Sequence, residues 1–433
     1  MSFPRYPKYK PSGVEWLGDM PAAWDVGALR WLTRRYSGGT PDKTNLTYWE
    51  GGTVPWLNSG AVNDRIIKEP STFITSEAFD NSSAKWVPEG ALVMALAGQG
   101  KTKGMVAQLA ISSTCNQSMA AIIPGARVQS RFLFWWLDSN YENIRNMAGG
   151  DLRDGLNLEL LGNIRCPLPL PAEQTLIAAF LDREIAKIDG LVAEQRRLME
   201  LLKEKRQAVI SHAVTRGLNP NVPFKPSGIE WLGDVPLHWE TAQSRRMFSV
   251  RSEPALQTDQ MLTASQKYGV LYQSDFVQRE GRRVVEVIMG VESLKHVEPD
   301  DFIISMRSFQ GGLEWSRLRG STSFHYVMIT PIKWVHPPFF AHLFKSLTYI
   351  QALQSTTDLI RDGQELRFSN FAQVSLPVVP IEEQVKIAAY LDKEITKFDT
   401  LTAEAQRAVD LLQERRTALI SAAVTGQIDV REH

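Results

Sequence analysis

The sequence is poor in features that define several large protein classes. It has two cysteines, Cys115 and Cys166, which are too few for a cysteine zinc site and are expected to be reduced core residues. Its longest apolar stretches, such as FLFWWL at 132–137, are far shorter than the roughly 20 residues that cross a bilayer. The N-terminus lacks the apolar segment of a secretory signal. We therefore expect a cytoplasmic protein with no metal site and no membrane contact.

A net charge is also lacking, because 48 Lys and Arg residues balance 48 Asp and Glu residues. This balance argues against a protein that coats polyanions, since non-specific nucleic-acid affinity comes from many neutralised phosphates. It leaves DNA recognition open, because basic residues can gather on one face. No low-complexity tract is present, and 433 residues are enough for two or three domains with cores of their own.

The most informative feature that is present is an internal duplication. KPSGVEWLGDMPAAW at 10–24 returns as KPSGIEWLGDVPLHW at 225–239, an offset of 215 residues. EQTLIAAFLDREIAKID at 173–189 returns as EQVKIAAYLDKEITKFD at 383–399, an offset of 210. The segments between these repeats differ. The pattern predicts a pseudo-twofold molecule in which the repeated parts form a shared frame and the differing parts meet different targets.

Each half ends in a long helical pattern in which apolar or long side chains recur in alternating steps of four and three. Five such heptads are typical of a coiled-coil seam, so we expect two helices of roughly 37 residues that pair with each other, in an antiparallel sense. Prolines before the patterns, and Gly217 and Gly426 after them, predict the helix ends. The seam positions are Leu181, Ile185, Ile188, Val192, Gln195, Met199, Leu202, Arg206, Val209 and Ala213, then Leu391, Ile395, Phe398, Thr402, Ala405, Val409, Leu412, Arg416, Leu419 and Ala423.

The differing segments have a mixed pattern. Strand-like runs such as ALVMALA (91–97) and FHYVMITPI (324–332) alternate with turn-rich loops, and one helical stretch follows in each half. The predicted fold class is α+β, with two globular domains separated by two long antiparallel coiled-coil helices. The expected divisions are a lead-in at 1–24, a domain at 25–166, a helix at 167–217, a second lead-in at 218–239, a second domain at 240–376 and a second helix at 377–433.

Residues 95–102, ALAGQGKT, fit a permissive form of the phosphate-binding P-loop. A working P-loop follows a buried strand and opens a helix, whereas the segment at 103–117 resembles another strand. No apolar run ending in Asp follows to hold magnesium, and the matching ISMRSFQGGLEW at 304–315 has no Gly-Lys-Thr. A P-loop ATPase is therefore the alternative and not the favoured interpretation.

A second catalytic-looking motif is HPPF at 336–339. Amino-group DNA methyltransferases place Asp, Asn or Ser before Pro-Pro-Tyr/Phe, and His336 cannot reproduce the hydrogen bonds of those residues to the target amine. Helix initiation by proline explains the motif better. Since no other catalytic set emerges, we expect a non-enzymatic protein that recognises or joins partners. A coiled-coil scaffold that never reads DNA is a further alternative.

Several stretches together resemble one known family. They are PSGVEWLGDMPAAW, the GGTP at 38–41, YWEGGTVPWLNSG, NSSAKWVPEGALVMA, NQSMAAIIP and the helix start PLP-x-PAEQ-x-x-IAAFLD. This set resembles the specificity subunit of type I restriction-modification systems. The resemblance covers essentially the whole chain, and the first half follows the family pattern more closely than the second.

The resemblance implies a non-catalytic subunit in which two target recognition domains each read one half of a bipartite site in double-stranded DNA. The paired helices would then set the spacer, much as dimer geometry sets half-site separation in other DNA readers. It further implies two methylation subunits, which bind AdoMet, and restriction subunits, which use ATP and magnesium. No cofactor is expected on this chain itself.

Base readout needs amides, guanidinium groups and hydroxyls delivered by loops, while Lys and Arg hold phosphates. On this basis the DNA-binding candidates are Ser59, Arg65, Gln99, Lys101, Lys103, Asn116 and Gln117 in the first domain, and Lys267, Tyr268, Arg307, Gln310, Arg317, Arg319 and His325 in the second. The loop GQGKTKG would then hold DNA phosphates in place of a nucleotide. Trp16 and Trp231 of the lead-ins are assigned to frame packing or partner docking, not to stacking on DNA.

Overall fold

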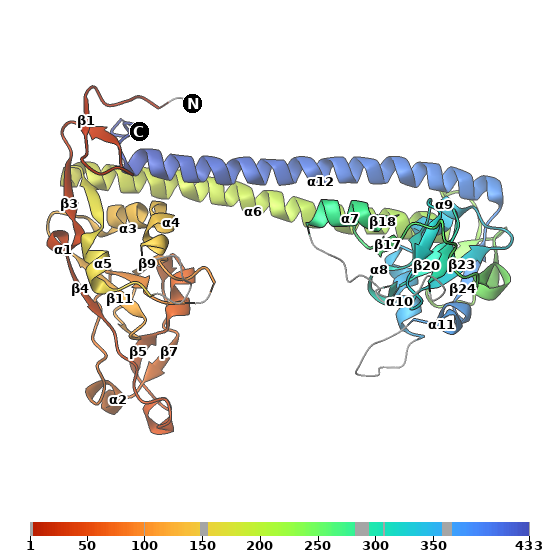
Figure 1. Ribbon diagram of the computed structural model, residues 1–433, viewed down its shortest axis with the longest axis horizontal. Helices are drawn as coiled ribbons and strands as arrows, with labels where there is room; N and C mark the ends of the chain where they lie inside the picture. Colours follow the sequence, from red (N-terminus) through yellow and green to blue (C-terminus); the bar gives the residue numbers. More distant parts are fainter. Residues whose placement is uncertain are drawn as a thin grey trace. The chain divides into compact units, whose positions relative to one another are not determined.

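The computed structural model describes residues 3–98, 100–147, 155–281, 294–305, 308–356 and 366–432. The chain divides into two compact units (Figure 1). Unit 1 comprises Met1–Gln195 and Arg407–His433, and unit 2 comprises Arg196–Gln406. Each unit therefore contains one lead-in, one domain and a part of each long helix, so the duplication seen in the sequence is also a division of the structure.

Unit 1 is built on a five-stranded sheet of order β4-β11-β8-β9-β6, with a three-stranded sheet of order β10-β5-β7 beside it. Most pairings are antiparallel, while β6 runs parallel to β9 and β10 parallel to β5. The elements are β1 (Tyr9–Pro11), β2 (Asp19–Pro21), β3 (Asp25–Ala28), α1 (Leu29–Leu32), β4 (Thr33–Ser37), η1 (Leu46–Tyr48), β5 (Val54–Leu57), η2 (Ser59–Asn63), β6 (Ile66–Ile67), β7 (Thr72–Ile74), α2 (Ser76–Asp80), β8 (Leu92–Ala95), β9 (Val106–Leu109), β10 (Thr114–Cys115), β11 (Met119–Pro124), α3 (Ser130–Ser139), α4 (Tyr141–Asn146), α5 (Leu158–Asn163) and β12 (Arg165–Leu168).

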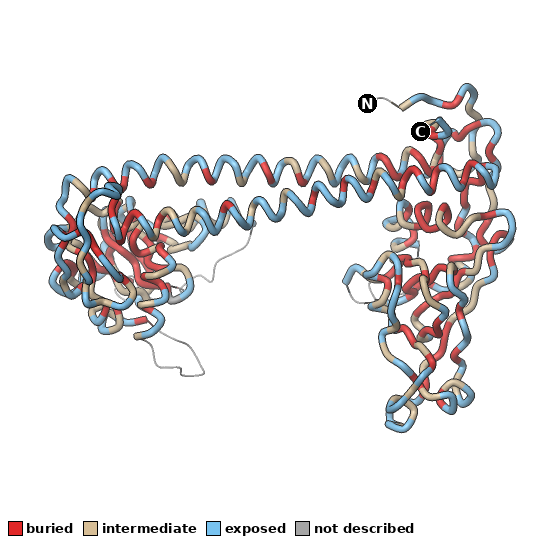
Figure 2. Tube along the Cα trace, turned by 180° about the vertical axis from the view of Figure 1, so that it is seen from behind, coloured by how far each residue is buried: buried red, intermediate tan, exposed pale blue. Residues whose placement is uncertain are grey.

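The central strands of unit 1 are apolar on both faces because both faces are covered. Leu92 and Met94 of β8 pack into a core with the aromatic residues of α3, whereas the alternate residues Val93 and Ala95 pack into a second core. The α3 core continues to Leu181 on the first long helix. Figure 2 shows this run of buried chain from the sheet through α3 to the helix. Helix α3 thereby fixes the domain to the frame.

Unit 2 uses a smaller sheet of order β16-β23-β20-β21. An aromatic cluster fills its core, with the ring of Phe248 between 5.4 and 5.8 Å from those of Phe302, Phe340, Phe344 and Phe371. The elements are β13 (Phe224–Pro226), β14 (Asp234–Pro236), β15 (Glu240–Gln243), η3 (Ser244–Arg246), β16 (Phe248–Arg251), β17 (Leu262–Ser265), β18 (Gly269–Tyr272), α7 (Gln273–Glu280), β19 (Lys295–Val297), β20 (Phe302–Ile304), α8 (Ser308–Gly311), β21 (Glu314–Trp315), β22 (Gly320–Thr322), β23 (Val327–Pro331), α9 (Pro337–Leu343), α10 (Leu347–Gln354), α11 (Phe368–Gln373) and β24 (Ser375–Val378).

The long helices are α6 (Pro171–Arg216), of 46 residues, and α12 (Ile381–Val424), of 44 residues. Every predicted seam position on both helices is buried or half-buried. In unit 1 the first part of α6 shares a core with the last part of α12, and in unit 2 the last part of α6 shares a core with the first part of α12. The antiparallel coiled coil and the α+β fold class are confirmed. The predicted length of roughly 37 residues was too short.

Both catalytic-looking motifs have structural explanations. ALAGQGKT joins β8 to β9, which are antiparallel neighbours, so strand and not helix follows the Gly-Lys-Thr. HPPF begins α9, with His336 as the N-cap and proline in the first turn. Both interpretations made from the sequence are confirmed.

Candidate nucleic-acid interface

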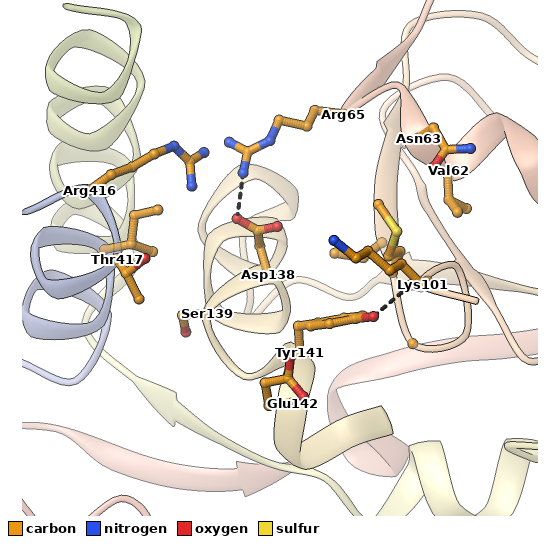
Figure 3. Close-up of a pocket in the computed structure, with 14 residues that line it drawn as sticks. Val62, Asn63, Arg65, Lys101, Asp138, Ser139, Tyr141, Glu142, Arg416 and Thr417 are labelled. Carbon is orange, nitrogen blue, oxygen red and sulfur yellow. Dashed lines mark hydrogen bonds and ion pairs between the residues drawn. The ribbon is translucent and has the colours of Figure 1, made fainter. Parts of the chain in front are cut away.

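A cavity of about 420 Å³ in unit 1 brings together two of the predicted DNA-binding residues, Arg65 and Lys101. It lies where the loop between β8 and β9 meets the end of α3, the start of α4 and one face of α12 (Figure 3). The polar residues of its lining are Asn63, Arg65, Lys101, Asp138, Ser139, Tyr141, Glu142, Arg416 and Thr417.

Arg65 is held between an acid and an aromatic ring. Its guanidinium forms an ion pair with Asp138 at 3.1 Å and lies 5.5 Å from the centre of the Trp135 ring. Burial lowers the pKa of Arg65, Asp138 opposes that shift, and the nearby charge of Arg416 adds to it. Figure 3 shows the guanidinium groups of Arg65 and Arg416 pointing toward each other.

Two guanidinium groups that face each other favour an anion between them, because an anion relieves their repulsion. Asp138 neutralises part of the charge of Arg65, and Asp189 on α6 pairs with Arg416 at 2.9 Å. Lys101 extends the positive lining on the opposite wall of the cavity. The arrangement of Arg65, Arg416 and Lys101 can therefore receive a phosphate of a nucleic acid.

The loop that carries Lys101 is fixed by α4. The Tyr141 hydroxyl donates to the Lys101 carbonyl at 2.5 Å, and the Arg145 guanidinium donates to the Gly100 carbonyl at 2.6 Å. Gly100 and Gly104 adopt φ values of +83° and +87°, which favour glycine. The glycines therefore serve a tight turn between two strands, and α4 sets where that turn presents its backbone.

In unit 2 a cavity of about 340 Å³ brings together the predicted residues Tyr268 and Arg317. Arg317 lies over the Trp315 ring at 4.5 Å, and the Tyr268 hydroxyl donates to Glu280 at 2.7 Å. Lys345 also lines this cavity and forms an ion pair with the buried Glu314. Burial raises the pKa of Glu314, and Lys345 opposes that shift.

The remaining described candidates of unit 1 do not line its cavity. Lys103 is only 5% exposed, and the phosphate role predicted for it stays a prediction. Ser59 begins η2 and is half-buried, while the exposed Gln117 contacts the Thr40 hydroxyl. The side-chain oxygen of Asn116 is buried with no hydrogen-bond partner in the described structure. Gln99 lies outside the described residues.

The remaining described candidates of unit 2 are exposed but dispersed. Lys267 pairs with Glu280 at 3.0 Å, and Arg319 lies 3.5 Å from Glu298. Gln310 is exposed on α8, and the His325 ring stacks on Phe324 at 3.9 Å. Arg307 lies outside the described residues. The DNA-binding roles of these residues stay predictions.

Sequence reasoning missed the cavity residues supplied by other elements. Asp138 and Tyr141 come from α3 and α4, and Arg416 comes from α12. One signal was available, since arginines occupy two seam positions, Arg206 and Arg416, where a coiled coil usually carries apolar residues.

Cys115 and Cys166 are free and buried, as expected for core residues. Burial raises the pKa of the Cys115 thiol to about 12. Within the described ranges, no three His, Cys, Asp or Glu side chains come together in a group that could hold a metal ion. In that same part of the chain, none of the helices combines the length and apolar character that a membrane span requires.

With the geometry of both units described, the protein class follows from comparison. Residues 24–197 match the family described as type I restriction modification DNA specificity domain, so unit 1 carries a domain of that class. The chain is 26% identical over 196 residues to the EcoR124I/EcoR124II specificity subunit of Escherichia coli, covering 43% of this chain and 48% of that one. It is 25% identical over 196 residues to the MjaIX specificity subunit of Methanocaldococcus jannaschii, covering 43% of each. The matched parts span about half the length of these relatives.

Solved structures extend the likeness in fold to nearly the whole chain. A chain from a structure of the assembly and conformational transition of a type I restriction-modification system gives a TM-score of 0.67 at 14% identity, covering 94% of this chain and 98% of that one. The HsdS subunit from Thermoanaerobacter tengcongensis gives a TM-score of 0.53 at 14% identity with the same coverage. Residues 24–197 thus carry a type I restriction modification DNA specificity domain, and the chain shares its fold with these solved structures.

Proposed function

We propose that this chain is the DNA specificity subunit of a type I restriction-modification complex. Each of the two domains, at 25–166 and 240–376, reads one half of a bipartite site in double-stranded DNA. The helices α6 and α12 set the number of unread base pairs between the half-sites. The chain itself performs no chemistry and directs adenine methylation and restriction by its partner subunits.

One observation supports this proposal. The duplicated frame, which consists of the lead-ins and the long helices, carries two domains, here called heads, that differ in sheet order and in cavity lining. A scaffold that joined two identical proteins without reading DNA would have no need for dissimilar heads. The loop structure of ALAGQGKT also removes the reason to consider a P-loop ATPase, because no helix N-terminus follows it to bind phosphates.

The partners follow from the same proposal. Two methylation subunits, which supply AdoMet, would occupy the two equivalent parts of the frame, and restriction subunits, which use ATP and magnesium, would join the larger complex. In unit 1 the phosphate contacts would come from Arg65, Lys101 and Arg416. In unit 2 they would come from Arg317 and Lys345.

The test is to lengthen both helices by one heptad. Seven residues inserted after Gln195 in α6 and after Ala405 in α12, which the offset of 210 relates, keep the seam in register. At about 1.5 Å per residue, the insertion lengthens each helix by roughly 10 Å, which corresponds to about three base pairs at 3.4 Å each. We expect the methylated motif, read by sequencing modified DNA, to keep both half-sites and gain about three spacer base pairs.

The control carries the insertion in α6 alone. It breaks the register between the helices and should abolish methylation without producing a new motif. An unchanged spacer in the double insertion, with methylation intact, would contradict the proposal.

A further inference from the structure

Two further cavities, one in each unit, occupy equivalent positions in the duplicated frame. The Trp16 pocket, about 300 Å³, lies in unit 1 between Trp16 of the lead-in, helix α4 and the turn from α5 to β12. The Trp231 pocket, about 620 Å³, lies in unit 2 between Trp231, helix α10 and the turn from α11 to β24. The offset of 215 carries Trp16 to Trp231, and the offset of 210 carries the turn at 163–165 to that at 373–375.

Each pocket has an indole wall that is held from behind by a buried aromatic ring. Trp16 is 44% exposed and stacks on Trp136 with ring centres 5.2 Å apart. Trp231 packs edge-on against Tyr349 at 5.6 Å, and its indole N–H donates to the Ser375 carbonyl at 3.2 Å. These contacts fix the orientation of both indoles before any partner binds, which lowers the entropic cost of binding.

The facing walls are polar but mostly uncharged. Carboxamides dominate in unit 1, with Asn143 and Asn146 on α4 and Asn163 before β12. Carboxamides and hydroxyls dominate in unit 2, with Gln351 on α10 and Ser355 at its C-cap. Side chains of this kind donate to and accept from peptide groups.

This chemistry argues against a nucleic acid in the pockets. Each pocket lining contains a single charged residue, Arg165 in unit 1 and Glu230 in unit 2, and these have opposite signs. A phosphate backbone needs several cations, which line the candidate interface and not these pockets. An indole facing carboxamides instead suits a peptide segment, whose apolar side chain packs on the ring while its backbone bonds to the amides.

The duplication indicates how many copies of the occupant bind to the chain. The two heads differ, whereas the lead-in tryptophan and the turn beside it recur in both halves. We propose that the Trp16 pocket and the Trp231 pocket each bind the same peptide segment of one protein partner present in two copies. The inference rests on the proposed function, under which that partner is the methylation subunit.

The experiment counts methylation subunits bound to the full chain by native mass spectrometry. Asn146→Arg on α4 and Ser355→Arg at the C-cap of α10 place a long cation in each pocket from an exposed position, without touching the aromatic packing. We expect two subunits bound to the wild type, one to either single variant and none to the double variant. The matched control is Leu347→Arg, an exposed position on α10 outside the pocket lining, which should still bind two.

A second pair of variants separates docking from folding. Trp16→Ala should weaken binding at one site at least tenfold, and Trp16→Phe should restore most of it, while both variants unfold at temperatures close to that of the arginine variants. A double arginine variant that still binds two subunits overturns the inference and leaves the proposed function standing. A wild-type chain that binds none overturns both. Self-association of the chain that the arginine substitutions abolish would make the occupant a second copy of this chain and also overturn the inference.

Discussion

In unit 1 the fully buried Gln174 accepts a hydrogen bond from the Gln129 backbone N–H at 2.7 Å and donates to the carbonyls of Arg127 and Pro169 at 3.0 and 2.9 Å. Its counterpart in unit 2, Gln384, makes the same three kinds of contact. These are to the His336 N–H and to the carbonyls of Trp334 and Val379, at 2.8 Å each. In both units one glutamine joins the start of the long helix to the start of the helix that carries the domain.

Other frame contacts keep their position and change their partner. Asp182 accepts from the Trp135 indole at 2.9 Å, and the equivalent Asp392 contacts His342 at 2.8 Å. Trp135 and His342 occupy the same position in α3 and α9 when Gln129 is matched to His336. The frame therefore requires a hydrogen-bond donor at this point, and more than one side chain can supply it.

The cavities show the least similarity. Asp138 at the end of α3 pairs with Arg65, whereas the matching residue after α9 is Lys345, which pairs with Glu314. The signs of the two pairs are exchanged. The glutamine contacts of the frame tolerate no such exchange, because their partners are backbone groups, whereas a contact within a domain can be rebuilt from two side chains at once. The comparison thus separates the residues that attach each domain to the long helices from the residues that give each domain its own cavity.

The largest effect should come from removing the shared glutamine. Gln174→Ala or Gln384→Ala leaves one backbone N–H and two carbonyls without their partner, and buried groups left unpaired cost about 1–3 kcal/mol each. We expect a loss of about 3 kcal/mol of unfolding free energy in either variant, since part of the vacated space admits water. Thermal unfolding measures this loss of stability, and hydrogen exchange measured separately for the amides of each unit shows which unit is destabilised.

The matched controls are Thr175→Ala and Val385→Ala, at the next position of each helix, where the side chains are exposed. These should change stability by less than about 0.5 kcal/mol. If Gln174→Ala destabilised unit 1 while Gln384→Ala left unit 2 unchanged, the two contacts would not be equivalent, and the separation of frame from head would fail.

Much of this frame could be predicted from sequence because it depends on local periodicity. The seam positions, the helix ends at Gly217 and Gly426, and the proline start of α9 are all confirmed. The helix length was underestimated because the first turns of α6 bury Ile177, Ala178 and Phe180 against the domain, which is a wider face than a seam.

The candidate interface was predicted only in part, because its residues meet through tertiary structure. The position of Arg65 opposite Arg416 depends on how α12 packs on unit 1, and no local pattern encodes that contact. The two lysines of the turn between Gly100 and Gly104 differ in exposure, which the sequence did not indicate. Lys101 lines the cavity, and Lys103 is buried two residues later. A basic loop indicates phosphate binding only when its backbone geometry is known.

A smaller difference between the stabilities of the two units should appear when pH is varied. Six of the seven histidines lie in unit 2, and the seventh, His433, lies outside the described residues. Burial lowers the pKa of His296, but hydrogen bonds and charges from Glu298 and Asp259 outweigh it, so this pKa lies above 6.5. Its stabilisation is complete below pH 6.5 and is lost as pH rises through the folded-state value. Burial lowers the pKa of His342, with Asp392 opposing, so its contribution is lost as pH falls below 6.5.

Unit 2 should therefore lose stability on both sides of about pH 6.5, while unit 1 stays nearly constant between pH 6 and 8. Hydrogen exchange resolved by unit, across that range, measures the difference. His296→Gln should flatten the alkaline side of the unit 2 profile and leave its acidic side unchanged. A profile for unit 1 as steep as that for unit 2 would contradict the assignment.

The smallest effect is expected from the two ion pairs that link α6 to α12. The offset of 210 carries Asp189 to Asp399 and Arg206 to Arg416, so one pair is the counterpart of the other. Arg416 and Asp189 are 2.9 Å apart with the arginine side chain 18% exposed, whereas Arg206 and Asp399 are 3.6 Å apart with the arginine 36% exposed. The shorter and less exposed pair should be the stronger.

Double-mutant cycles with alanine at both partners measure the coupling of each pair. We expect about 0.5 kcal/mol for Arg416 with Asp189 and about 0.2 kcal/mol for Arg206 with Asp399, both reduced by added salt because the carboxylates are largely exposed. Arg416 also faces Arg65, and this repulsion lowers the net stabilisation that Arg416 gives. Arg65→Ala should therefore increase the destabilisation caused by Arg416→Ala and leave that caused by Arg206→Ala unchanged. Equal coupling energies in both pairs, with a cost of Arg416→Ala that is insensitive to Arg65, would contradict this difference between the units.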